Sequence, residues 1–96
     1  MNWTIKRIRK DQTPDLHGQN GNDYIMVISS GYGDEFSFVV RRTIKGGGKT
    51  VEAVMQKGKG YTLDAVVRCL KTRDIIIPGH VIEDFRNQIA WYRHEY

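Results

Sequence analysis

The spacing of apolar residues changes once along this chain of 96 residues, and that change constrains the fold more than any other feature. In the first part of the chain, apolar residues alternate with polar ones, as at Phe36 and Phe38 around Ser37. This is the period of a β-strand with one buried face. From Thr62 onward, apolar residues recur at intervals of three and four, which is the period of an amphipathic helix. The chain is therefore predicted to form a sheet first and then helices that pack on it.

Four segments are predicted to be strands, and glycine-rich turns join the last three of them. The run 24–28 is apolar throughout, which predicts a central strand buried on both faces. In the next strand, Phe36, Phe38 and Val40 are expected to point one way and Ser37, Val39 and Arg41 the other. We expect an antiparallel meander of three to four strands, over residues 3–9, 24–28, 35–43 and 50–57.

Residues 11–23 are dense in Asp, Asn, Gly and other turn-forming residues. Such a composition predicts a loop, and a loop of this length is often functional or mobile. We therefore predict a mobile loop over 11–23 within a single α+β domain spanning residues 1–96. The length suits one domain with one hydrophobic core.

Two helices are predicted after the strands. Thr62 is a good N-cap, and Asp64 places negative charge in the first turn, where the helix dipole favours it. A stripe of Leu63, Val66, Val67 and Leu70 would face the core. The segment 75–79 interrupts the helical pattern, and a second helix starts near His80. Its apolar face holds Ile82, Phe85, Ile89 and Tyr92. The expected fold class is α+β, with both C-terminal helices packed on one face of the sheet.

The net charge of +4 hides blocks of opposite sign. Residues 41–73 carry nine basic and two acidic side chains, and residues 1–10 carry four basic side chains and no acidic one. Residues 11–40 between them carry five acidic side chains and no Lys or Arg. A block of one sign indicates an anionic partner. The alternative is a solvated face whose charges only keep a small protein in solution.

The search for catalytic motifs finds no pattern that a reaction would need. The residues Gly48, Lys49 and Thr50 match the last three positions of a phosphate-binding-loop motif. That motif also requires a glycine at the position of Thr43 and a helix after Thr50, where a strand is predicted instead. Cys69 lies among apolar residues and is most simply a small buried hydrophobe. No Asp or Glu is followed two residues later by Lys, as many metal nucleases require. We therefore expect no catalytic residues and no enzyme.

No metal site and no cofactor are expected either. The candidate ligands are His17, Cys69, His80 and His94, and no two of them have the spacing of a clustered metal site. Because the only cysteine in the chain is Cys69, no internal disulfide can form, which favours a reducing, cytoplasmic location. No apolar stretch approaches the length needed to cross a membrane.

Binding is the function that remains. The leading hypothesis is a small non-enzymatic nucleic-acid-binding protein that contacts phosphates through a basic strand-and-turn face. Tyr61 is flanked by a glycine-rich loop and is a candidate for stacking on a base. The predicted contacts are Arg41, Arg42, Lys45, Lys49, Lys57 and Lys59, extended by Lys6, Arg7, Arg9 and Lys10.

One family resemblance points the same way. The predicted order of four strands followed by a helix is similar to the fold of single-strand-binding transcriptional coactivators. The segment that leads into this helix is Gly58-Lys-Gly-Tyr-Thr-Leu63. The resemblance covers about half of the chain, and the type of nucleic acid stays open between DNA and RNA and between single and double strands. The long second helix departs from that family.

A hypothesis from another class is a protein-interaction module, such as a small phage-type inhibitor or adaptor that docks on an acidic protein surface. An acidic loop at 11–23 would favour it, since acidic patches repel nucleic acid. A third hypothesis is a structural subunit that works as a homo-oligomer. Trp91, Tyr92 and Tyr96 either close the core or form a homodimer contact.

Overall fold

The computed structural model describes residues 1–7, 13–21, 23–30, 35–43, 49–54 and 61–95 of the chain. Its elements follow one another as five strands and then two helices. They are β1 (Asn2–Lys6), β2 (Asp15–Asn20), β3 (Asp23–Ser30), β4 (Glu35–Thr43), β5 (Lys49–Val54), α1 (Leu63–Lys71) and α2 (Gly79–Glu95).

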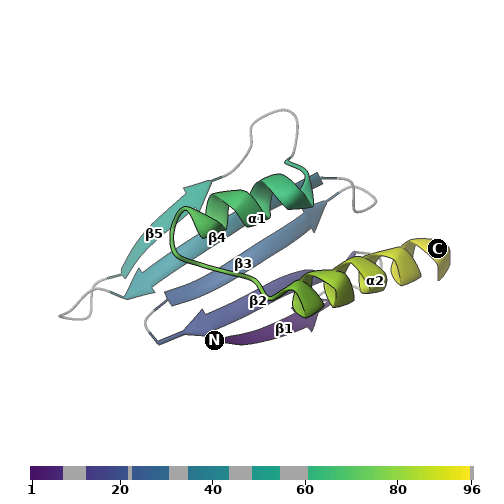
Figure 1. The fold of residues 1–96 in the computed structure, drawn as a ribbon, viewed down its shortest axis with the longest axis horizontal. Helices are drawn as coiled ribbons and strands as arrows, with labels where there is room; N and C mark the ends of the chain where they lie inside the picture. Colours follow the sequence, from purple (N-terminus) through teal and green to yellow (C-terminus); the bar gives the residue numbers. More distant parts are fainter. Residues whose placement is uncertain (8–12, 22, 31–34, 44–48, 55–60, 96) are drawn as a thin grey trace.

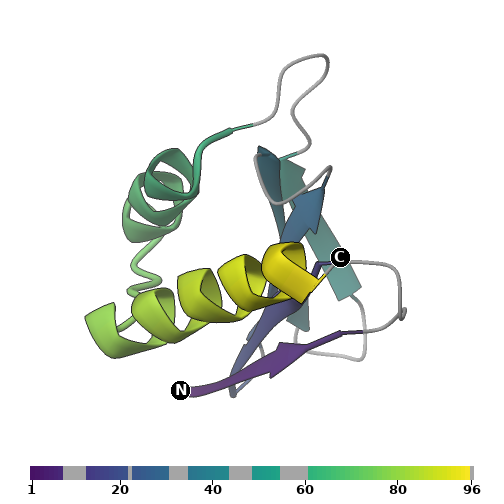
Figure 2. The same ribbon diagram turned by 90° about the vertical axis from the view of Figure 1, so that its right-hand side faces the viewer.

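The strands form one antiparallel sheet in the order in which they occur in the chain, so each strand pairs with the next. Both helices lie on the same side of this sheet, α1 over β4 and its neighbours and α2 along the β1 edge (Figures 1 and 2). The predicted α+β class, antiparallel meander and pair of C-terminal helices are confirmed. The sheet has five strands where three to four were expected.

The additional strand lies in the segment predicted to be a mobile loop. That prediction is wrong for residues 15–20, which form β2 between β1 and β3. Polar side chains hold its start against β3: the Ser29 backbone N–H donates to Asp15 Oδ1 at 3.0 Å, and the Ser29 hydroxyl donates to the Pro14 carbonyl at 2.7 Å. The Thr13 and Ser29 hydroxyl oxygens lie 2.5 Å apart. Residues 11, 12 and 22 lie outside the described residues.

The core lies between the sheet and the helices. Phe36, Phe38 and Val40 of β4 are buried, as their alternation predicted. Within the predicted run 24–28, however, only Ile25 and Val27 are fully buried, and Tyr24, Met26 and Ile28 are half-buried. The expectation that this strand is buried on both faces is wrong, because both helices cover the same face of the sheet.

The first helix, α1, begins after Thr62, as the sequence predicted. The Thr62 hydroxyl accepts a hydrogen bond from the Ala65 N–H at 3.1 Å, which is the N-cap geometry. Leu63, Val66 and Leu70 are buried in the core. The chain then turns through Asp74, whose φ of 60° stops the helix.

The second helix packs through the apolar face that the sequence predicted. Phe85, Ile89 and Tyr92 are buried, and the Phe85 ring meets the edge of the Phe36 ring with centroids 6.0 Å apart. Tyr92 therefore closes the core, whereas Trp91 on the same helix is 60% exposed. Tyr96 lies outside the described residues.

Candidate nucleic-acid interface

The face of the sheet opposite the helices, here called the helix-free face, carries the residues that alternate with the core positions. The strand register aligns them in rows across the sheet, because directly paired residues of antiparallel strands lie on the same face. One row is Asn2, Gln19, Tyr24 and Arg41, and the next is Thr4, His17, Met26 and Val39. Beyond them, Lys6 pairs with Asp15, and Ile28 pairs with Ser37.

The topology brings part of the predicted basic block to one end of this face. Arg41 is exposed on β4 beside Tyr24. Lys49 lies on the backbone of β5 at the same end, in register with Thr43, whereas Arg42 alternates with Arg41 and so occupies a position of the opposite face. The β2–β3 connection and the start of β1 lie at this same end of the sheet (Figure 1). The row that begins at Asn2 is therefore the row nearest to these basic positions.

The other predicted contact residues are distributed differently. Lys6 is exposed on the helix-free face, whereas the Arg7 guanidinium lies 5.6 Å from the centre of the Tyr92 ring and so contacts α2. Tyr61 packs partly against the core, and its backbone pairs with Phe36 at the far end of β4 from Arg41. The structure thus does not bring Tyr61 to the helix-free face. The predicted contacts that lie outside the described residues are Arg9, Lys10, Lys45, Lys57 and Lys59.

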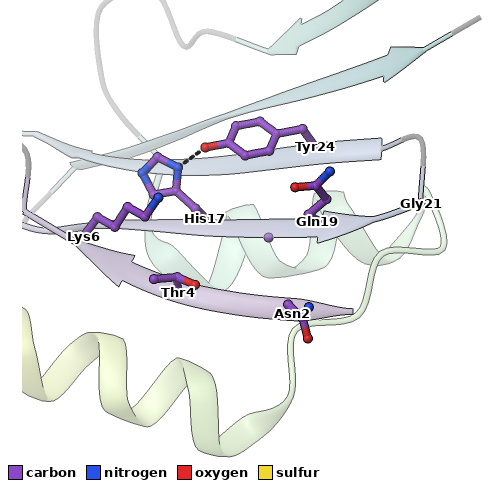
Figure 3. A pocket seen from close by; sticks show the side chains of 8 residues that line it. Asn2, Thr4, Lys6, His17, Gln19, Gly21 and Tyr24 are labelled. Carbon is purple, nitrogen blue, oxygen red and sulfur yellow. Dashed lines mark hydrogen bonds between the residues drawn. The ribbon is translucent and has the colours of Figure 1, made fainter.

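A pocket of about 410 Å³ opens on the helix-free face over β1, β2 and the start of β3. His17 and Tyr24 stand at one side of it, and their side chains are joined by a hydrogen bond between His17 Nδ1 and the Tyr24 hydroxyl (Figure 3). The two ring centroids lie 5.8 Å apart. Polar side chains and backbone complete the wall, from Asn2, Thr4, Lys6, Gly18, Gln19 and Gly21.

His17 is buried although it lies on the helix-free face, with 8% of its surface exposed. Its Nε2 atom is buried and has no hydrogen-bond partner among the described residues. Burial lowers the pKa of His17, and the positive charge of Lys6 lowers it further, while Asp15 acts in the opposite direction. Burial also raises the pKa of Asp15, against the effect of its hydrogen bond from Ser29 and of the nearby His17.

The lowered pKa of His17 predicts a dependence of stability on pH. In the unfolded chain His17 titrates near 6.5, and in the folded protein it titrates below that value. Between the two values the unfolded state binds more protons, so the free energy of unfolding should fall as the pH drops below 6.5. Urea unfolding at several pH values between about 8 and 5 measures this decline.

The variant His17→Gln should reduce the decline, whereas the same substitution at the exposed His80 should leave it in place. The contribution of Asp15 has the opposite sign and begins at its ordinary pKa of 3.8, from which it extends toward higher pH. An equal decline in wild type and His17→Gln would show that another group causes it.

Comparison with family models, curated proteins and solved structures found no match. Within the described ranges, no three His, Cys, Asp or Glu side chains are grouped so that they could hold a metal ion. Among the same residues, no helix is both long and apolar enough to cross a membrane.

The sequence does not single out the pocket residues, for a specific reason. Tyr24 belongs to an apolar run that predicts a buried strand, and His17 lies in a segment whose composition predicts a loop. The segment from Leu16 to Gln19 does alternate apolar or small residues with polar ones, which is a strand signal. The surrounding turn-forming residues obscured it.

Proposed function

We propose that this protein binds single-stranded nucleic acid across the helix-free face of its sheet, without catalysing a reaction. The observation that supports this best is the row Asn2, Gln19, Tyr24 and Arg41. It sets two amides, one aromatic ring and one cation side by side on a face that neither helix covers. An exposed sheet face with an aromatic side chain is a common surface for unpaired bases.

The apolar content of the face favours a single strand over a duplex. Met26, Ile28 and Val39 are half-buried at the centre of the helix-free face. The flat surfaces of unpaired bases can cover such residues, whereas a duplex presents its phosphates and keeps its bases stacked inside. A single strand therefore gains apolar contact here in addition to its ionic contacts.

The charges on the face indicate where a phosphate backbone would lie. Arg41 lies at the end where β5 adds the strand position Lys49, the register partner of Thr43. The exposed Glu35 lies at the other end of β4. Asp23, the register partner of Arg42, alternates with Tyr24 and so occupies a position of the opposite face. A phosphate backbone is therefore expected to contact Arg41 at its end of the sheet and Lys6 at the other end of β1, the second exposed cation of the helix-free face.

The proposal predicts the salt dependence of binding. Labelled single-stranded DNA and RNA, and matched duplexes, are titrated with the protein at salt concentrations from about 50 to 200 mM, and binding is followed by fluorescence anisotropy. The double variant Lys6→Ala and Arg41→Ala should bind single strands more weakly. Since each lost phosphate contact removes roughly 0.7 from the slope of log affinity against log salt, the slope should become shallower by about 1.4.

The matched control is the double variant Arg68→Ala and Lys71→Ala. It removes the same charge from exposed positions on α1, which lies on the other side of the sheet. This control should leave the slope close to that of the wild type. A control that weakens binding as much as Lys6→Ala with Arg41→Ala would place the interface elsewhere, and no binding at about 50 mM salt would refute the proposed function.

A second candidate is a protein-interaction module, favoured by one observation. Trp91 on α2 is 60% exposed, and exposed tryptophans are frequent anchors of protein interfaces. A protein that binds none of the nucleic acids above would make this the preferred function. The surface to test would then be the outer side of α2 around Trp91.

A further inference from the structure

The pocket beside Tyr24 offers a more specific role than general contact with a strand. We propose that it holds one unstacked nucleotide, with the base against the Tyr24 ring and the phosphate next to Lys6. This inference rests on the proposed function, because it assigns one subsite within the helix-free face. The pocket volume of about 410 Å³ leaves space for a planar group together with its water.

The aromatic wall is held in place from one side. The hydrogen bond between His17 Nδ1 and the Tyr24 hydroxyl anchors the end of the tyrosine side chain (Figure 3). Tyr24 is half-buried, so part of the ring contacts the sheet and part remains available to a ligand. A ring that is already fixed loses little conformational freedom when a base stacks on it.

The polar wall matches the edge of a base. Gln19 is exposed, and it lies between Asn2 and Tyr24 in the row across the sheet. A side-chain amide has a donor and an acceptor side by side, and base edges present the complementary pair. The Thr4 hydroxyl, next to His17 in the second row, adds a group that can either donate or accept.

The buried His17 provides an independent sign that the pocket receives a ligand. More than nine-tenths of its surface is buried, and Nε2 has no partner within the described part of the chain. A buried polar atom without a partner is costly, and such atoms in native proteins call for an explanation. A polar ligand in the pocket would supply the missing hydrogen bond.

Lys6 lies close to His17 and is the residue proposed to bind the phosphate of the nucleotide. Its side chain extends toward the His17 ring in Figure 3, and its charge acts on His17. A lysine side chain has a long flexible stem, so its ammonium can move to a phosphate at small cost. That movement would open Nε2 to the bound nucleotide.

The test compares an intact single strand of about twelve nucleotides with an abasic strand of equal length, which keeps the phosphates and lacks the bases. Tyr24→Leu should weaken binding of the intact strand about tenfold and leave binding of the abasic strand unchanged. Gln19→Ala, at an exposed position where folding is not at risk, should weaken the intact strand about fivefold. Tyr24→Phe keeps the ring and should retain most of the affinity.

The matched control is Gln88→Ala, which makes the same substitution as Gln19→Ala at an exposed position of α2, on the other side of the sheet. It should bind both strands as the wild type does. Free mononucleotides should compete with the intact strand if the pocket recognises a nucleotide by itself, whereas competition only by oligomers would show that the neighbouring phosphates are also needed. Both results support the pocket.

The two proposals fail in different ways. If the wild type binds neither strand, the proposed function fails and the pocket assignment fails with it. If the wild type binds the intact strand and both Tyr24→Leu and Gln19→Ala bind it equally well, only the pocket assignment is overturned. Equal losses for the intact and the abasic strand would also overturn it, because the pocket would then act on phosphates alone.

Discussion

Replacing Phe85 by alanine is expected to lower the free energy of unfolding by about 3–5 kcal/mol, the usual cost of removing a large aromatic side chain from a core. Phe85 is fully buried, and its ring meets the edge of Phe36 from β4. The substitution leaves a cavity between α2 and the sheet. Since domains of this size are stable by only about 5–15 kcal/mol, the loss is a large fraction of the total. Equilibrium unfolding in urea measures it.

The control for Phe85→Ala is Trp91→Ala, another aromatic truncation in the same helix. Trp91 is 60% exposed, so its loss should change the free energy of unfolding by no more than about 0.5 kcal/mol. Similar losses for the two variants would contradict the packing of α2 described above. A small effect of Phe85→Ala alone would have the same meaning.

Replacing Gly18 by alanine is expected to destabilise the protein by about 1–3 kcal/mol, although alanine suits a strand better than glycine does. The ring of Trp3, its register partner on β1, lies directly over Gly18. A Cβ atom at this position would lie 2.5 Å from Trp3 Cζ3 and 2.6 Å from Cε3. Trp3 would therefore have to move and give up part of its packing against the core.

A double-mutant cycle shows whether Trp3 causes this cost. In a Trp3→Ala background the space over Gly18 is free, so Gly18→Ala should lose most of its destabilising effect. Gly79→Ala is the matched control, because a Cβ there meets nothing within 4 Å. We expect it to be neutral or to stabilise by up to about 1 kcal/mol. If Gly18→Ala lowers the free energy of unfolding as much in the Trp3→Ala background as in the wild type, the backbone and not Trp3 causes the loss.

The helices and the fourth strand could be predicted because their signals are local. The N-cap at Thr62 and the buried positions from Leu63 to Leu70 depend on residues within one helix. The alternation of Phe36, Phe38 and Val40 fixes which face of β4 is buried. Each of these patterns contains enough apolar residues to outweigh the turn propensities around it.

β2 could not be predicted because its stability comes from its neighbours. Its sequence contains Asp15, Gly18 and Asn20, which are unfavourable in isolated strands. Pairing on both sides with β1 and β3, the bonds from Ser29 and the Trp3 ring over Gly18 offset that preference. The Ser29 bonds and the Trp3 ring come from outside the short stretch of sequence in which a strand pattern is recognised.

The pocket could not be predicted for a similar reason. His17 lies in a polar segment and Tyr24 in an apolar one, so no sequence pattern indicates that they meet. The register of β2 with β3 brings His17 to Tyr24. The basic residues, by contrast, were visible in the sequence as a block. Among the basic residues that the structure describes, Lys6 and Arg41 lie on the helix-free face, whereas Arg7 contacts Tyr92 of α2.

The sequence by itself determined the α+β class, the two helices with their buried faces and the uneven distribution of charge. Those properties follow from the period of apolar residues and from composition, which are local in the chain. Only the tertiary structure decided that residues 15–20 form a central strand, that one sheet face stays free of helices, and which side chains line the pocket on that face. These depend on strand register, which is set by how the turns and the buried faces of neighbouring strands fit together and not by the pattern within one strand.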